Sequence, residues 1–111
     1  MSAGSSEFRV PETEMADLKA IASESDVAGA LDIFKALADD RRILIMRLLD
    51  ESDLCVCDLV EVFDIEYSKL SYHLKKLKDA DLVATDRTGN YVTYRPTERG
   101  EEVIEIIRRI C

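Results

Sequence analysis

The chain has 111 residues, enough for one domain with a hydrophobic core but not for two. Hydrophobic residues make up 47% of it, no apolar run is long enough to span a membrane, and its first residues lack an apolar signal segment. A net charge of −8 argues against a general nucleic-acid binder, and three cysteines, an odd number, argue against a disulfide framework. We therefore expect a cytoplasmic protein with reduced thiols and no membrane partner.

Charge is unevenly distributed along the chain. Residues 69–95 carry a net charge of +3, which leaves −11 for the rest. A basic segment on an acidic body is a candidate phosphate-binding surface. From charge alone, a solvated lysine-bearing helix is the better explanation of the segment.

The first half of the chain predicts three helices after a polar start. Residues 1–10 are expected to be disordered, which leaves residues 11–111 as one domain. A first helix begins near Pro11 and carries Met15, Leu18 and Ala22 on one face. A second apolar stripe comprises Ala30, Leu31, Phe34, Leu37 and Ala38. Asp39 and Asp40 then supply a cap for a third helix over residues 41–50, which is apolar around most of its girth and should be buried.

Two short helices with a brief break follow. Val56, Leu59, Val60 and Phe63 have the spacing of one helical face. After residues 64–66, Leu70, Leu74 and Leu77 give a second stripe, from about Tyr67 to Ala80. This pattern predicts a helix-turn-helix over about residues 56–80.

The remaining residues predict a hairpin and a last helix. LVATDR and YVTYR have strand periodicity and flank Thr88-Gly89-Asn90, so we expect a β-hairpin wing over about residues 82–95. Thr97 can cap a helix over about residues 97–111, whose apolar stripe is too wide for the surface of a monomer. The predicted dimer interface comprises Met15, Leu18, Val103, Ile106, Ile107 and Ile110. The expected fold is mainly α with a small β-hairpin wing, a winged helix-turn-helix that forms a homodimer through its terminal helices.

One face of the second helix of the motif is suited to DNA. At 100° per residue, the side chains opposite the leucines are polar or basic and could enter a major groove. The predicted DNA-binding residues are Tyr67, Ser68, Lys69, Ser71, Tyr72, Lys75 and Lys76 on the helix, with Arg87 and Arg95 on the wing. His73 flanks the core, where a packed, hydrogen-bonded histidine is the simpler interpretation. A hairpin that only covers the core is the corresponding alternative for the wing.

The order of these elements, together with four segments, resembles the ArsR–SmtB family of winged-helix metalloregulatory repressors. The segments are FKALADDRRILIMRLL, DLCVCDL, SKLSYHLKKLKDADLV and GNYVTYRPTERG, and the similarity runs from about Ala30 to Ile107. DLCVCDL is similar to the arsenic-type metal box of that family. The resemblance implies a repressor that binds double-stranded operator DNA as a homodimer and releases it when arsenite or antimonite binds Cys55 and Cys57.

The chain also departs from the family pattern. Val60 stands where the box often has a third cysteine, Glu66-Tyr67 replaces the usual Ser-Gln, and Tyr72 replaces a histidine. These changes predict an operator that differs from the commonest site of the family. Residues 97–111 contain no histidine, so the zinc site that the family can place on its last helix is absent from the sequence.

The Cys-Val-Cys spacing suggests how an ion could act on the helix. If both cysteines were helical, their side chains would lie about 200° apart, so one ion could bind both only by loosening the first turn. Thiolates select soft ions. As(III) or Sb(III) is favoured by the resemblance. Cd(II), Pb(II) and Zn(II) fit less well, because cadmium-type sensors of the family use further N-terminal cysteines and residues 1–54 have none.

Several alternatives remain open from the sequence. Cys111 could be a third ligand or an idle terminal thiol. The Cys55–Cys57 pair could be a redox switch, or two half-buried helix residues in a DNA-binding regulator without a ligand. A thiol enzyme or metal carrier has no further support, since the chain lacks a Gly-rich phosphate loop and a nucleophile–His–acid set. We therefore expect a regulator and not an enzyme.

Overall fold

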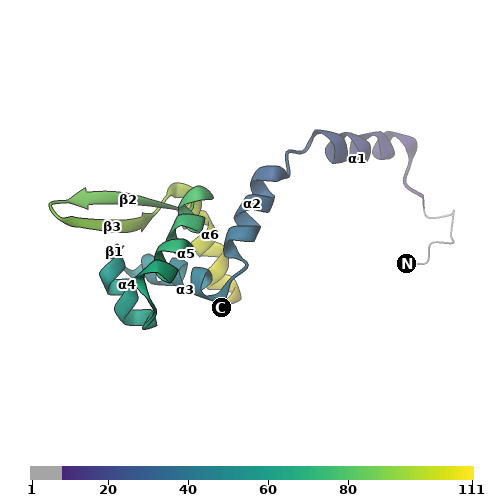
Figure 1. Cartoon of the computed structure of the whole chain (residues 1–111). Coiled ribbons are helices and arrows are strands. Elements are labelled where there is room, and N and C mark those ends of the chain that lie inside the picture. The colour runs from purple at the N-terminus through teal and green to yellow at the C-terminus, as the bar shows by residue number, and fades with distance from the viewer. Residues whose placement is uncertain (1–8) are drawn as a thin grey trace.

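The computed structural model describes residues 9–111. Within these residues, six helices and three short strands follow one another (Figure 1). They are α1 (Glu12–Glu24), α2 (Ala28–Leu37), α3 (Asp40–Glu51), β1 (Leu54–Cys55), α4 (Val56–Phe63), α5 (Tyr67–Asp79), β2 (Val83–Thr88), β3 (Tyr91–Pro96) and α6 (Glu98–Ile110). The predicted disorder of residues 1–10 falls largely on residues 1–8, which lie outside this range. The prediction of a mainly α fold with a hairpin wing is confirmed.

The hydrophobic core lies where α3, α5 and α6 meet, with α4 and the start of β2 closing it. The leucine stripe of α5 faces inward as predicted, and α3 contributes Ile45 and Met46. Fully buried residues are Ile45, Met46, Leu59, Leu70, Leu74, Leu77 and Leu82. Burial of a side chain of this size stabilises the fold by about 1.5–3 kcal/mol. The core therefore fixes the inner face of α5 and leaves its outer face free.

Side-chain caps set the starts of three helices. Asp39 accepts hydrogen bonds from the N–H groups of Arg41 and Arg42 and begins α3, as predicted. Thr97 Oγ1 accepts from the N–H of Gly100 and begins α6, also as predicted. The start of α4 is capped by Cys55, which the sequence did not suggest.

The wing is part of a three-stranded antiparallel sheet with the order β1-β3-β2. β2 and β3 pair over six residues, from Val83 with Pro96 to Thr88 with Tyr91. Gly89 has φ +62 in the turn between them, a conformation that favours glycine. The two-residue strand β1 adds to the other edge of β3 and was not predicted.

Helix α6 packs closely against the rest of the chain. A Cβ on Gly100 would lie 2.0 Å from the carbonyl oxygen of Leu82, so the first turn of α6 requires glycine at this position. In its last turn, Arg108 donates two hydrogen bonds to the carboxylate of Asp50 on α3, at 2.9 and 2.7 Å. These contacts tie α6 to the core at both ends.

Helix α1 stands apart from this body (Figure 1). None of its residues is buried, and Leu18 and Ile21 are exposed. Within residues 9–111, no helix combines the length and the apolar character that a membrane span requires.

Candidate ligand site and nucleic-acid interface

Cys55 and Cys57 occupy different kinds of backbone. Cys55 is the last residue of β1 and the N-cap of α4, with an extended backbone (φ −86, ψ 167), whereas Cys57 lies in the first turn of the helix. The two residues are therefore not both helical, and the opposed arrangement considered from the sequence does not occur. The extended backbone of Cys55 lets its side chain turn toward Cys57.

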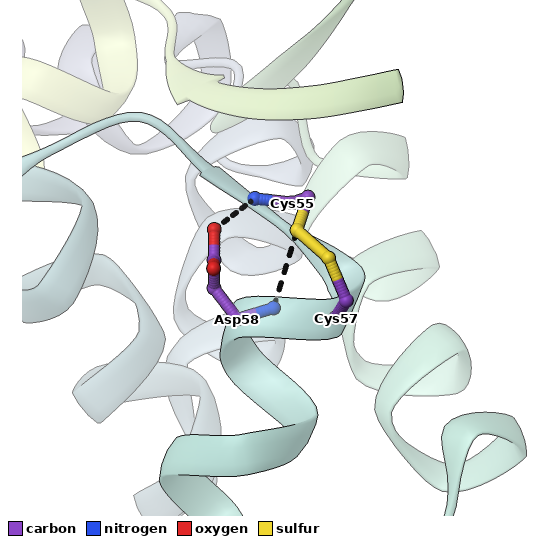
Figure 2. The surroundings of a disulfide bond; sticks show 3 residues. All are labelled: Cys55, Cys57 and Asp58. Atoms are coloured by element: carbon purple, nitrogen blue, oxygen red, sulfur yellow. Dashed lines mark hydrogen bonds between the residues drawn. A yellow bond between two sulfur atoms is a disulfide. The ribbon is translucent and has the colours of Figure 1, made fainter. Parts of the chain in front are cut away.

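The two sulfur atoms are joined in a disulfide (Figure 2). The prediction that these thiols are reduced is therefore wrong for this structure. The physical reason is local, because the strand-to-helix junction brings the Cα atoms of the two residues to 5.3 Å. Once reduced, the pair is placed so that both sulfurs can contact one ion without a bend in α4.

Asp58 completes this junction. Its N–H donates to Cys55 Sγ at 3.2 Å, and its carboxylate accepts from the N–H of Cys55 at 3.0 Å, which is a reciprocal capping box (Figure 2). Cys55 is half-buried, while Cys57 and Asp58 are exposed. The sulfur of Cys55 thus has a structural role in α4 besides any role toward a ligand.

Within residues 9–111, one group of three side chains has the proximity needed to hold a metal ion, and it consists of Cys55, Cys57 and Asp58. Their ligand atoms lie within 4.8 Å of one another. The sequence interpretation missed Asp58, although its position three residues after Cys55 is a recognisable capping signal. Cys111 is exposed, free and outside this group, so its role as a third ligand stays a prediction.

The outer face of α5 is open to solvent and carries mixed polar and basic side chains. Ser71 is half-buried, and the other predicted contacts on α5 are exposed, namely Tyr67, Ser68, Lys69, Tyr72, Lys75 and Lys76. Lys75 forms an ion pair with Asp79 at 2.9 Å, and the Lys76 ammonium lies 5.3 Å from the centre of the Tyr72 ring. Their contacts with DNA stay a prediction.

The two arginines of the wing differ in their partners. Arg95 Nε donates to Asp86 across the β2–β3 ladder at 2.6 Å. Arg87 is exposed near the turn and, among residues 9–111, has no ion-pair partner. Arg87 is therefore the wing arginine that is available to a phosphate.

His73 is buried on the inner flank of α5, which confirms its interpretation as a packed, hydrogen-bonded histidine. Arg42 Nη1 lies 3.1 Å from its Nδ1 and must be the donor, since a guanidinium has no acceptor. Burial lowers the pKa of His73 below 6.5, the positive charge of Arg42 lowers it further, and the carboxylate of Asp39 opposes them. The ring is thus neutral, with its proton on Nε2.

An apolar groove of about 450 Å³ runs between α2 and α6. Phe34, Ile106 and Ile110 are exposed along it, with 57% of Ile106 open to solvent. Val103 and Ile107 also line the groove but are nearly buried in the core of their own chain. Of the residues predicted at a dimer interface on α6, Ile106 and Ile110 therefore have the most surface to offer.

Comparison with known proteins places this geometry in a family. The model of the family described as bacterial regulatory protein, arsR family, matches residues 39–85, which cover α3, the cysteine pair, α5 and the start of the wing. A protein of Halobacterium salinarum that bears the name ArsR is 30% identical over 93 residues, which are 82% of this chain and 72% of that protein. The chain belongs to the ArsR family. The resemblance of its sequence segments to that family is confirmed.

One further relative of this ArsR-family chain and one solved structure of similar fold are informative. The arsenical resistance operon repressor of Bacillus subtilis is 50% identical over 62 residues, which are 55% of this chain and 59% of that protein. The chain thus spans about three fifths of that relative. The homodimeric winged helix-turn-helix DNA-binding domain Mb0332 from Mycobacterium bovis superposes with a TM-score of 0.66 at 24% identity, over 93% of this chain and 85% of that one. This likeness confirms the winged helix-turn-helix fold.

Membership of the ArsR family also decides the broad class of the protein. The family consists of DNA-binding regulatory proteins. The prediction that the chain is a transcription regulator and not an enzyme is confirmed by its family, and a thiol enzyme or metal carrier has no support from it.

Proposed function

We propose that the protein is a homodimeric transcriptional repressor of an arsenical or metal resistance operon. It binds double-stranded operator DNA through α5 and the wing, and it leaves the operator when arsenite or antimonite binds the reduced pair Cys55–Cys57. The proposal places it in the cytoplasm. The observation that carries it is the position of two adjacent sulfur atoms at the first turn of the helix-turn-helix.

The chemistry of the pair supports a thiophilic inducer. Two thiols can displace two hydroxyl groups of arsenous acid, so that two As–S bonds form, two As–O bonds break and two water molecules are released. The arsenic then keeps one hydroxyl group, unless Cys111 of either protomer replaces it. Thiolate sulfur prefers soft ions to Mg²⁺ or Ca²⁺. The carboxylate of Asp58 beside the sulfurs leaves Cd(II), Pb(II) and Zn(II) as weaker alternatives.

Binding at this place can lower DNA affinity because Cys55 caps α4. A sulfur bound to arsenic is a poorer acceptor for the N–H of Asp58, so ligand binding competes with the capping box that orders the first turn. The ligand then stabilises a form of the helix pair that fits the major groove less well. Release from DNA requires only that this form bind the ligand more tightly than the DNA-bound form does.

Cysteine variants test the proposal under reducing conditions. Cys55→Ser and Cys57→Ser should each keep operator affinity, because serine is close in size and can also cap the helix. Each should abolish release by arsenite, measured by fluorescence anisotropy of a labelled operator, because one thiolate cannot hold the ligand at two points. Cys111→Ser is the matched control among the cysteines. A shift of its release curve to higher arsenite would support a third ligand, and an unchanged curve would limit the site to the pair.

The disulfide favours a second candidate function, a thiol redox switch at the same pair. Two thiols would give two protons and two electrons to a peroxide while the disulfide forms, so that hydrogen peroxide becomes two water molecules and an organic hydroperoxide becomes an alcohol and one water molecule. Operator release by peroxide in the absence of metalloid, and its reversal by a phosphine reductant, would favour this function. Release by arsenite in the continued presence of the reductant would favour the metalloid sensor.

A further inference from the structure

The strand β1 gives the cysteine pair a direct connection to the wing. Leu54 and Cys55 pair with Tyr94 and Thr93 of β3. β3 is the central strand of the sheet and begins directly after the turn at the tip of the wing. Cys55 therefore belongs to the wing sheet and, as N-cap, to the first helix of the helix-turn-helix.

Figure 1 shows the same relationship at the level of the fold. β1 lies beside β3, and α4 follows it directly, so the root of the wing and the start of α4 adjoin each other. Tyr94 lies at this root, half-buried against the core.

The pairing that joins β1 to the wing is shorter than the pairing within the wing, whose base also contacts α3, α5 and α6. β2 and β3 pair over six residues, so the hairpin can move as one unit. β1 contributes only two residue pairs, and one of them contains Cys55. A two-residue strand has few ladder hydrogen bonds to hold its register, so a small change at Cys55 is enough to disturb it.

We propose that β1 transmits ligand binding at Cys55 and Cys57 to the wing, so that the ligand releases DNA in part by moving the wing away from its phosphate contacts. This inference rests on the proposed function. The sulfur of Cys55 turns from the Asp58 N–H to the ligand, and the backbone of Cys55 follows. The pairing of Cys55 with Thr93 then loosens, and the hairpin keeps only the contacts of its base with α3, α5 and α6, so its tip can change position. Cys55 acts here as a positioning residue for the wing as well as a ligand.

The test compares one variant of the wing with one of the recognition helix. Arg87→Ala removes the available wing arginine, and Lys75→Ala removes a basic side chain from α5. Both should weaken operator binding. The measured quantity is the ratio of the operator Kd with arsenite to the Kd without it, at equal salt and with a phosphine reductant that contains no competing thiol.

The expected result is asymmetric. Lys75→Ala should change the ratio less than Arg87→Ala does, because Lys75 lies on α5 and the route through the wing does not act on it. Arg87→Ala should lower the ratio by at least about threefold, a coupling typical of groups in one network, because this variant lacks the wing arginine even without arsenite. Equal ratios in the wild type and both variants would overturn the inference.

Hydrogen exchange of the full chain, measured without DNA, is an independent test of the inference. Arsenite should speed amide exchange at Leu54, Cys55 and Tyr94 while leaving the β2–β3 ladder, including Thr93, protected. The double variant Cys55→Ser, Cys57→Ser should show no change. If arsenite releases the wild type but neither the exchange nor the ratio responds, the wing route is wrong and the proposed function stands. If arsenite does not release the wild-type protein from its operator, the wing route and the proposed function are both wrong.

Discussion

Nη1 of Arg42 donates a hydrogen bond to Nδ1 of His73 over 3.1 Å, and Nε of the same guanidinium donates to the carbonyl of Ala36 over 2.6 Å. One side chain at the start of α3 thereby holds the last turn of α2 and the inner face of α5. Because α2 lines the apolar groove and α5 carries the predicted DNA contacts, Arg42 fixes their relative placement. This hydrogen bond requires a neutral imidazole.

The stability of the protein should therefore depend on the protonation of His73. Its pKa is lowered in the folded state, first by burial, so the unfolded chain binds more protons between the folded pKa and about 6.5. The free energy of unfolding should fall as pH decreases from 7 through 6.5 and level off below the folded pKa. His73→Gln should remove this dependence in urea titrations. NMR of the only histidine in the chain should show the lowered pKa directly.

A second titration should be separable at lower pH. Burial by itself would raise the pKa of Asp39, but the N–H of Arg42 and the positive charges nearby outweigh it and hold that pKa below 3.8. The stability that Asp39 contributes is present above 3.8 and lost as pH falls through its folded pKa. Asp39→Asn should flatten the pH dependence in this acidic window only. A variant that also flattened the change near pH 6.5 would contradict the assignment to two groups.

Gly100 should tolerate no side chain. Its Cβ would meet the carbonyl oxygen of Leu82 at 2.0 Å, so Gly100→Ala must move α6 away from the start of β2. Overpacking of this kind costs about 1–3 kcal/mol of unfolding free energy. Gly29→Ala in α2 is the matched control, because nothing lies within 4 Å of its Cβ, and it should stabilise by about 0.5–1 kcal/mol. Chemical denaturation of both variants measures the difference.

Assembly should depend on the exposed side of α6. Ile106→Asp places a charge in the apolar groove without disturbing the core, whereas Ile107→Asp would confuse dissociation with unfolding because Ile107 is nearly buried. Ile106→Asp should give folded monomers by analytical ultracentrifugation, with little operator affinity. Val62→Asp on α4 is the control, since Val62 is also 57% exposed but lies outside the groove. A wild type that is monomeric at micromolar concentration would contradict the predicted dimer.

Substitutions of polar and of basic side chains on α5 should differ in how strongly their effect on binding depends on the DNA sequence. Ser71→Ala and Tyr72→Ala should weaken operator binding more than binding to random duplex, because these residues are predicted to touch base edges. Lys75→Ala should weaken both, and the slope of log K against log salt should become shallower by about one, because one phosphate is no longer neutralised. Equal effects of all three variants on both duplexes would contradict the assignment.

The helices of this protein could be predicted from sequence because most of them have a clear apolar period and two have a strong cap. Asp39 and Thr97 occupy the predicted caps, and the leucine stripe of α5 faces the core. β1 could not be predicted, since a strand of two residues has no period. Its existence depends on β3, which lies far along the chain from it.

The site was harder to predict than the fold for the same reason. Periodicity extends α4 smoothly back through Cys55, whereas the tertiary pairing with Thr93 holds Cys55 in an extended conformation. The predicted wide apolar stripe on α6 likewise contains both core residues and exposed residues, which sequence spacing alone cannot distinguish. Val103 and Ile107 fill the core of their own chain, while Ile106 and Ile110 remain exposed.

The two cysteines should differ in their effect on stability, because only Cys55 caps α4. With both thiols reduced, Cys55→Ala leaves the N–H of Asp58 without its acceptor and should lower the unfolding free energy by about 1 kcal/mol. Cys57→Ala removes an exposed side chain that has no part in the capping box and should change stability by less than about 0.5 kcal/mol. Cys55→Ser should restore the cap and equal or exceed the wild type, because serine is a favoured N-cap residue. Urea titrations with a phosphine reductant distinguish these cases. Equal losses for Cys55→Ala and Cys57→Ala would show that the capping box does not stabilise α4, and the proposed competition between ligand and cap would then lose its physical basis.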